Sequence, residues 1–396
     1  MDPWAALSLL IVLLTYLGLA LGGFPGYRMN RAGVALVGAS FLVLLGILDL
    51  EAAWEALDAH TLVFLFGVMV LNAQLSYAGF FALAVQGLLR LARTPLALLV
   101  LLTFGAGGLS ALFLNDTMAL LLTPLLLQIA RFLGLNPTPY LLALMGAVNT
   151  GSLMTPTGNP QNILVASLSG ISYLGFLGAL WPVALFGLAS QVLLLALLYP
   201  EVRSLRPLPP LRPVRARVHP ALLRKGLLVT LALLLAFLLG YPMAQAALVA
   251  AGVLLFTRRL RSERFFLRVD WELLVMFAGL FMVTEGVRRL GLAEGLLSLA
   301  QSPLGLLLSA TLLSLLLSNV PAVLLLAQGV EGEALWLLLA GGSTLAGNLT
   351  LLASVANLIV AEGAGKEGVR VGFGEHLRFG LPLTLLTLAF LYLWLT

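Results

Sequence analysis

Long apolar segments follow one another along almost the whole chain and constrain its fold more than any other feature. The first runs from residue 4 to 22, and comparable segments recur as far as 379–395. Of the 396 residues, 61% are hydrophobic and only 10% are charged, a composition typical of proteins that cross a bilayer many times. The sequence therefore predicts an all-α polytopic, multi-pass protein of the inner or plasma membrane, in contact with lipid over most of its length.

Several apolar segments are too short to span a bilayer alone and occur in pairs around polar breaks rich in glycine and proline. The breaks read "LNDT" at 114–117 and "NTGSLMTPTGNPQNILVA" at 149–166 in the first half, and "SNVP" at 318–321 and "AGNLTLLASVANLIVA" at 346–361 in the second. The later break of each half aligns with its counterpart with a single gap, which places Gly151 opposite Gly347 and Asn162 opposite Asn357. This correspondence indicates an internal duplication.

The predicted domains are a first repeat, 1–200, and a second repeat, 226–396, joined by an arginine- and proline-rich linker, 201–225. The linker is predicted to be cytoplasmic, because most Lys and Arg residues then lie on one side of the membrane. The same membrane topology places the acidic loop 49–58 and its basic counterpart in the second repeat, 258–268, on opposite sides of the membrane. The repeats are therefore expected to be inverted in the membrane, an architecture found in secondary transporters.

Non-helical backbone at membrane depth is tolerated only where it is buried in protein or lines a wet cavity. The four breaks are therefore expected to meet at one polar site. Helix N-termini after the breaks favour an anion or a polar oxo-acid, whereas unwound carbonyl groups favour a cation, and the sequence leaves both open. The side chains predicted to bind substrate or ion are Asn115, Thr117, Thr155, Thr157, Asn159, Asn162, Ser318, Asn319, Asn348, Thr350, Ser354 and Asn357.

Asp116 is the carboxylate expected to lie deepest in the membrane. Acids inside a bilayer are energetically costly and are usually functional, and burial favours the protonated form, so that such a group can take up and release a proton. Asp116 is therefore predicted to be the proton-coupling residue. A simpler role, capping the helix that begins at Thr117, is compatible with this one.

For the other polar residues in the spans, structural roles are expected and not substrate or ion binding. Glu285 is expected to form a solvated ion pair with Arg288 and Arg289 near the outer surface. Gln74, its counterpart in the first repeat, is expected to make an interhelical hydrogen bond. The same interpretation applies to Asn72 and Asn149.

Several function classes are excluded. Cysteine is absent, which rules out disulfides and thiolate metal sites. The histidines His60, His219 and His376 lack metal-ligand spacing and are expected to be surface residues. The chain has no zinc-protease HExxH, no ATP-binding phosphate loop and no dinucleotide fingerprint. We therefore expect no enzyme activity, no catalytic residues, no metal centre, no cofactor and no nucleic-acid partner, and transport driven by an ion gradient.

At four motifs the chain resembles the ion transporter superfamily, and within it the arsenite permease, NhaD-type sodium/proton antiporter and melanocyte P-protein branch. The motifs are "NDTMALLLTP" (115–124), "TPTGNPQNILVA" (155–166), "GNLTLLASVANLIVAEGA" (347–364) and "GEHLRFGLPLTLLTL" (374–388). They occur in the expected order and run through nearly the whole chain. The family positions that bind substrate or ion match Asn115, Asp116, Thr117, Asn159, Asn319, Asn348 and Asn357.

The resemblance implies two inverted repeats, each with five spanning helices, one of them unwound, and one re-entrant hairpin. The site would lie between hairpin tips at 114–117 and 318–321 and unwound helices at 153–160 and 347–355. Related carriers of divalent anions are homodimers that move their site by an elevator motion, and both features are carried over as expectations.

The hairpin tips depart from those relatives. Sodium-coupled dicarboxylate carriers have Ser-Asn-Thr at both tips, whereas this chain has Leu-Asn-Asp-Thr and Ser-Asn-Val-Pro. We therefore predict a proton-coupled secondary active transporter that exports a small oxyanion or metalloid hydroxide, such as arsenite, antimonite or silicic acid. One alternative is a sodium/proton antiporter that uses the same Asp116. Another, of a different class, is an ion channel.

Overall fold

The computed structural model describes residues 3–24, 26–209, 218–292 and 294–396, so that 210–217 of the predicted linker lie outside the described residues. Every regular element within these ranges is helical. The first half contains α1 (Pro3–Leu21), α2 (Arg31–Leu44), α3 (Leu50–Glu55), α4 (Ala59–Ala78), α5 (Phe80–Leu89), α6 (Pro95–Leu112), α7 (Asn115–Leu133), α8 (Thr138–Ser152), the 3-10 turn η1 (Pro156–Gly158), α9 (Pro160–Ser169), α10 (Tyr173–Leu198) and η2 (Pro200–Arg203). The second half contains α11 (Pro220–Leu238), α12 (Met243–Leu255), α13 (Ser262–Phe266), α14 (Trp271–Arg289), α15 (Glu294–Ala300), α16 (Pro303–Leu317), α17 (Asn319–Ala327), α18 (Glu333–Ala346), α19 (Val355–Lys366) and α20 (Phe373–Leu395).

Six described helices are long and apolar enough to cross a bilayer, namely α4, α6, α7, α10, α11 and α20. Shorter apolar helices, among them α2, α12, α16 and α18, accompany them. Many leucines on α1, α10, α11 and α20 are exposed, as expected where lipid is the solvent. The predicted all-α polytopic class is confirmed, while the division into two inverted repeats stays a prediction.

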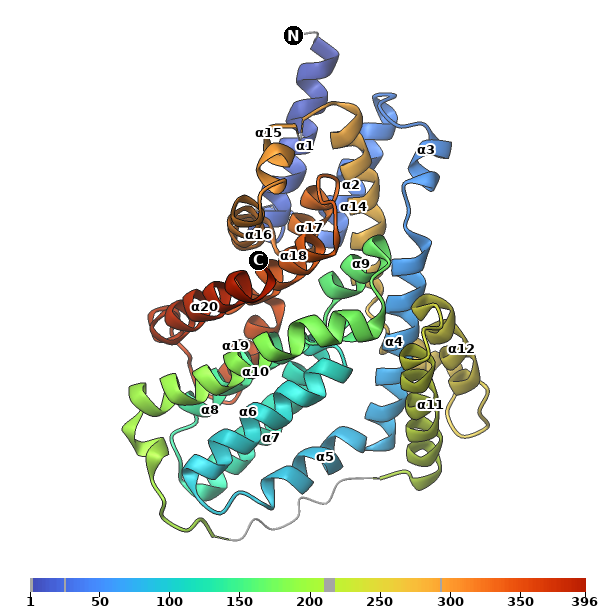
Figure 1. Ribbon diagram of the computed structural model, residues 1–396. Coiled ribbons are helices and arrows are strands. Elements are labelled where there is room, and N and C mark those ends of the chain that lie inside the picture. The colour runs from blue at the N-terminus through green and yellow to red at the C-terminus, as the bar shows by residue number, and fades with distance from the viewer. Residues whose placement is uncertain (1–2, 25, 210–217, 293) are drawn as a thin grey trace.

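The two halves of the chain are interleaved in space. α2 packs along α14, α4 contacts α11 and α12, and α10 lies against α20. In Figure 1, α1, α2 and α14 to α17 gather at one end, while α6, α7, α8 and α10 form the other. α7 packs on α8 and on α19, so the C-terminal half also reaches into the second group. Residues of both groups, on α2, α14 and α17 in the first and on α7 in the second, line one cavity.

The breaks have well-defined limits. α8 ends at Ser152 and α9 begins at Pro160, while α18 ends at Ala346 and α19 begins at Val355. The hairpin connections are shorter than expected, because α7 already begins at Asn115 and only Ser318 separates α16 from α17. Ser318 has a φ of 82°, the left-handed region that L side chains rarely adopt.

Two glycines permit close packing around the breaks. A Cβ on Gly151 would lie 2.3 Å from the Cα of Gly107, so α6 and α8 cross with their backbones in contact. A Cβ on Gly380 would lie 2.1 Å from the carbonyl oxygen of Asn348, so α20 presses directly on the second break. Any larger residue would push these helices apart.

Candidate functional site

A cavity of about 260 Å³ lies where the breaks meet. Its lining includes first-turn residues of α2, α7, α9, α14, α17 and α19, for example Arg31, Asn115, Gln161, Glu272, Asn319 and Val355. The first amide groups of a helix have no intrahelical partner and carry positive partial charge. The convergence of these helix starts therefore favours a ligand rich in oxygen atoms.

Three of these helix starts are open to a ligand. The residues that precede α7, α17 and α19 make no side-chain cap bond, although Asn115 Oδ1 accepts from the amide of Asp116 in the first turn of α7 (3.0 Å). By contrast, the side chain of Asn30 caps α2, and Asp270 accepts a hydrogen bond from the amide of Leu273 in α14 (2.9 Å). The uncapped N-termini leave backbone donors that a bound ligand can use.

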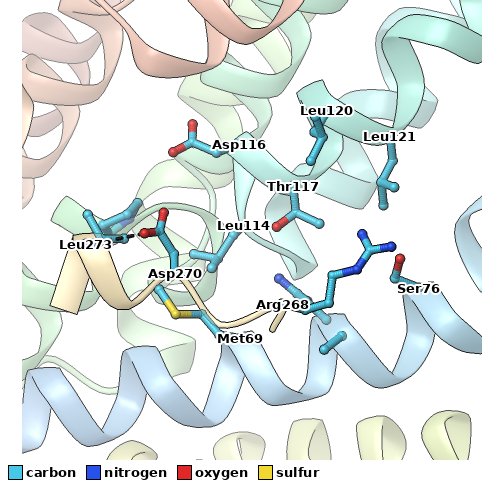
Figure 2. A pocket seen from close by; sticks show the side chains of 13 residues that line it. Met69, Ser76, Leu114, Asp116, Thr117, Leu120, Leu121, Arg268, Asp270 and Leu273 are labelled. Carbon is cyan, nitrogen blue, oxygen red and sulfur yellow. Dashed lines mark hydrogen bonds between the residues drawn. The ribbon is translucent and has the colours of Figure 1, made fainter. Parts of the chain in front are cut away.

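A smaller cavity of about 110 Å³ adjoins the first and also contains Thr117 and Arg268 in its lining. Asp116 and Asp270 line both cavities. Figure 2 shows the two aspartates extending from α7 and from the start of α14, with the Arg268 guanidinium group on the side of Thr117. The site therefore holds charges of both signs around the predicted coupling residue.

Asn149 connects the first hairpin tip to the second break. Its Oδ1 accepts hydrogen bonds from Ser354 Oγ (2.9 Å) and Asn115 Nδ2 (3.4 Å). Its Nδ2 donates to Asn357 Oδ1 (3.0 Å) and to the carbonyl oxygen of Gly347 (3.4 Å). The side chain is 2% exposed. Sequence reasoning assigned Asn149 one interhelical hydrogen bond, and its actual environment shows a junction of three segments.

Asn162 and Asn357 hold the two breaks in similar ways. Asn162 Nδ2 donates to the carbonyl oxygens of Ser152 (3.0 Å) and Thr155 (3.1 Å), and Asn357 Nδ2 donates to those of Gly347 (2.8 Å) and Thr350 (3.2 Å). Each thus satisfies carbonyl groups that the interrupted helix leaves without partners.

The two asparagines are also bonded across the halves. Thr344, in the second half, donates to Asn162 Oδ1 (3.2 Å), while Asn149, in the first half, donates to Asn357 Oδ1 (3.0 Å). Within the first half Asn149 precedes Asn162, and within the second half Thr344 precedes Asn357 by the same number of residues. This reciprocal exchange is consistent with the duplication that the sequence predicts.

Further polar side chains fix the breaks to their neighbours. Thr155 and Thr157 both donate to the carbonyl oxygen of Ala111 at the end of α6, the latter at 3.3 Å. Asn348 Nδ2 donates to Thr150 Oγ1 (2.9 Å). The tip, the first break and the second break therefore form one hydrogen-bonded unit.

The structure separates the predicted binding residues into two sets. The residues that line a cavity are Asn115, Asp116, Thr117, Ser318, Asn319 and Ser354, of which Asn115 and Ser354 also bond Asn149. The residues that hold the breaks are Thr155, Thr157, Asn159, Asn162, Asn348 and Asn357, together with Thr350 through its carbonyl group. The sequence does not show which polar residues belong to which set. In the breaks the backbone is not helical, so the direction of each side chain cannot be derived from helical periodicity.

Sequence reasoning missed four charged residues at the cavities, namely Arg31, Arg268, Asp270 and Glu272. In the predicted membrane topology, the segments that contain these residues are loops and ends of spans outside the site. The signal was present, since Asp270 stands immediately before the apolar segment 271–286, and an aspartate at that position often caps a helix. Only the fold shows that this helix start faces Asp116.

The interhelical hydrogen bond expected of Asn72 is wrong, because its Nδ2 and Oδ1 are buried without a hydrogen-bond partner among the described residues. The interhelical bond of Gln74 is confirmed, since its Nε2 donates to the carbonyl oxygen of Leu222 (2.9 Å). The ion pairs of Glu285 with Arg288 (2.6 Å) and Arg289 (3.0 Å) are also confirmed.

The histidine prediction is right for two residues and wrong for the third. His60 and His219 are exposed. His376 is 1% exposed, with its Nε2 3.4 Å from Asn357 Nδ2. His376 is buried because α20 packs across the second break. The isolated position of His376 in the sequence does not reveal this packing.

Comparison with known proteins identifies the family. The model of a family described as citrate transporter matches residues 9–340. The chain belongs to the citrate transporter family. It is therefore a membrane transporter, and the predicted placement in the ion transporter superfamily, near arsenite permease-like proteins, is confirmed, as is its multi-pass location in the plasma membrane.

Several curated proteins resemble the chain over most of their length. The silicon efflux transporter LSI3 of Oryza sativa subsp. japonica is 29% identical, over 92% of this chain and 92% of that protein. The inner membrane protein YbiR of Escherichia coli (strain K12) is 30% identical, over 88% and 90%. A Dictyostelium discoideum protein that bears the name transporter arsB is 24% identical, over 91% and 86%.

Two solved structures share the fold. The YdaH transporter of Alcanivorax borkumensis superposes with a TM-score of 0.59 at 17% identity, over 100% of this chain and 97% of that chain. The efflux pump MtrF of Neisseria gonorrhoeae superposes with a TM-score of 0.57 at 14% identity, over 100% and 94%. At these identities the likeness concerns the fold alone.

Proposed function

We propose that this protein is a proton-coupled secondary active transporter that exports a small oxyanion or metalloid hydroxide, such as silicic acid, arsenite or antimonite. The observation that carries the proposal is the position of Asp116, which lines both cavities beside the neutral side chains of Asn115, Thr117 and Asn319. The relatives named for silicon efflux and as arsB add support from sequence.

The charges of the site favour a small and largely neutral substrate over citrate. The larger cavity contains three carboxylates, Asp116, Asp270 and Glu272, against the single guanidinium group of Arg31. A citrate trianion would meet these carboxylates at short range, and like charges repel strongly in a site of low dielectric constant. A neutral polyhydroxide avoids this repulsion, because its hydroxyl groups donate to carboxylate and amide oxygens and accept from the uncapped helix amides.

In this proposal, Asp116 exchanges a proton as the substrate enters or leaves. Coupling requires that the proton bind with different affinity in the two orientations of the site, because a ligand shifts an equilibrium only through differential affinity. The predicted inverted repeats and the elevator motion of related carriers would supply those orientations.

Proton flux in proteoliposomes tests the proposal. Purified protein is reconstituted with a pH-sensitive dye in the lumen, and silicic acid, arsenite, citrate and sodium are applied in parallel. We expect a luminal pH change with silicic acid or arsenite, and its loss in Asp116→Asn with normal insertion. The matched control is Asp49→Asn, which makes the same substitution at the exposed N-cap of α3, where Asp49 accepts from Ala52 (2.7 Å). Full activity of Asp116→Asn would refute the role of Asp116, and a response to citrate alone would refute the substrate class.

A sodium/proton antiporter is the second candidate, favoured by the proximity of the carboxylates of Asp116 and Asp270 to the helix breaks. In the same assay, sodium alone would then change the luminal pH. The channel alternative predicts flux that does not saturate with substrate concentration, whereas a carrier reaches a maximum turnover rate.

A further inference from the structure

We infer that Asp270 is the second carboxylate of the coupling site, and that Asp116 and Asp270 together bind one proton in the orientation seen here. The inference deepens the proposed function and rests on its assignment of Asp116. It gives a structural reason why the proton affinity of the site would change during transport.

The geometry places both carboxylates at one space. Asp116 and Asp270 line the larger cavity, and both also line the smaller one. Figure 2 shows their side chains entering this space from α7 and from the residue that precedes α14. In the sequence they are far apart, and in each case the next residues begin a helix whose N-terminus faces the site.

The nearby positive groups do not neutralise the pair by direct ion pairing. Neither aspartate is within salt-bridge distance of a basic group in the described structure. Arg268 stacks over the ring of Tyr77, with its guanidinium carbon 5.1 Å from the ring centre, and the Nε of Arg31 donates to the carbonyl oxygen of Leu19 (3.2 Å).

Glu272, at the rim of the larger cavity, adds a further negative charge. Two carboxylates that share a site and lack ion-pair partners favour a state with one proton bound, because ionising both places like charges together. With Glu272 also ionised, that preference is stronger. Arg268 and Arg31 act in the opposite direction.

The pair joins two differently packed groups of helices. α14 packs on α2, whereas α7 packs on α8 and α19, and α7 and α14 face one another across the cavities. A displacement of the α6–α7 hairpin relative to α14 would therefore separate the carboxylates. Asp116 would lose its negatively charged neighbour and release the proton more readily. The pair thus couples proton binding to the orientation of the site.

Asp270 has an evident structural role that the test must leave intact. Its Oδ1 accepts from the amide of Leu273 and so caps α14. Asn and Ser are equally good N-caps. The variants Asp270→Asn and Asp270→Ser therefore remove the charge and keep the cap, and two variants guard against a folding failure of either one.

The chain contains no cysteine, so one introduced thiol reports on the cavity without background. Met276, which lines the larger cavity, is replaced by cysteine, and its labelling by a membrane-impermeant maleimide is followed in proteoliposomes from pH 5 to 9 without substrate. The pH dependence that remains with Asp116→Asn reflects the thiol and the cavity carboxylates other than Asp116, and serves as the correction. In the Met276→Cys protein without further substitutions, the corrected labelling rate changes with pH, and the pH at half of that change is the midpoint.

We expect Asp270→Asn and Asp270→Ser to lower this midpoint by roughly one pH unit, since a neighbouring carboxylate favours the protonated form. Arg268→Gln should raise the midpoint, and Asp49→Asn should leave it unchanged. An unchanged midpoint in both Asp270 variants overturns the inference, because Asp270 is then only a helix cap. Because no substrate is added, a midpoint that shifts while silicic acid and arsenite are not transported supports the pair and refutes only the proposed cargo.

Discussion

Replacing Asn149 with aspartate tests how the two breaks are held together. The side chain lies among Ser354, Asn357 and Asn115 and is almost fully buried. Aspartate has the same shape and still accepts from Ser354. At the other end, however, it presents an oxygen to Asn357 Oδ1, where the amide donates at 3.0 Å. Asn357 cannot rotate its amide without losing the bond from its Nδ2 to Gly347 (2.8 Å).

The size of the effect follows from these contacts. Losing one buried hydrogen bond and leaving its acceptor unsatisfied costs about 1–3 kcal/mol, and burying an ionised carboxylate adds to it. We expect Asn149→Asp to lower the free energy of unfolding by about 3 kcal/mol at neutral pH. At low pH a protonated carboxyl group can donate to Asn357 Oδ1, so the stability of the variant should recover as pH falls.

Thermal unfolding of the purified protein in detergent, measured from pH 5 to 8, gives the required profile. The control is Asn30→Asp, which introduces the same charge at the exposed cap of α2, where the side chain accepts from the amide of Gly33 (2.9 Å). The control should unfold like the wild type throughout. If Asn149→Asp shows the same profile as Asn30→Asp, Asn149 does not hold the breaks together and the reasoning is wrong.

Two further predictions concern packing and the first break. Gly151→Ala should destabilise the protein by about 1–3 kcal/mol, because its Cβ would meet the backbone of Gly107 at 2.3 Å, whereas Gly108→Ala, which points into open space, should be nearly neutral in the same unfolding assay. Thr155→Val removes the hydroxyl group that donates to Ala111 and should cost about 1 kcal/mol; wild-type stability in this variant would show that the bond contributes nothing.

The broad features of the site could be predicted because they depend on local composition. The short apolar segments and their polar breaks mark where backbone leaves the helix inside the membrane, and Asp116 is conspicuous as an acid within such a break. These signals hold in any arrangement of the helices, because a bilayer penalises unpaired backbone and charge wherever they occur.

The division of roles within the site could not be predicted in this way. Asn159 and Asn319 look alike in the sequence, yet Asn159 donates to Ser152 inside the first break (2.9 Å), while Asn319 lines the cavity. Asn149 was expected to make only an interhelical hydrogen bond and His376 to be a surface residue, yet both contact the second break. Their partners are distant in the sequence, and one sequence holds no record of which distant groups meet.

The sequence by itself determined that this chain is an all-helical membrane protein with interrupted helices and an acid at one interruption, because hydropathy and local breaks act through nearest neighbours and the bilayer. Only the tertiary structure decided that the starts of α7 and α14 face one cavity, which brings Asp270 opposite Asp116. That encounter depends on how α14 packs on α2 and α7 on α19. Such packing follows from the shapes of whole helices and has no local signature.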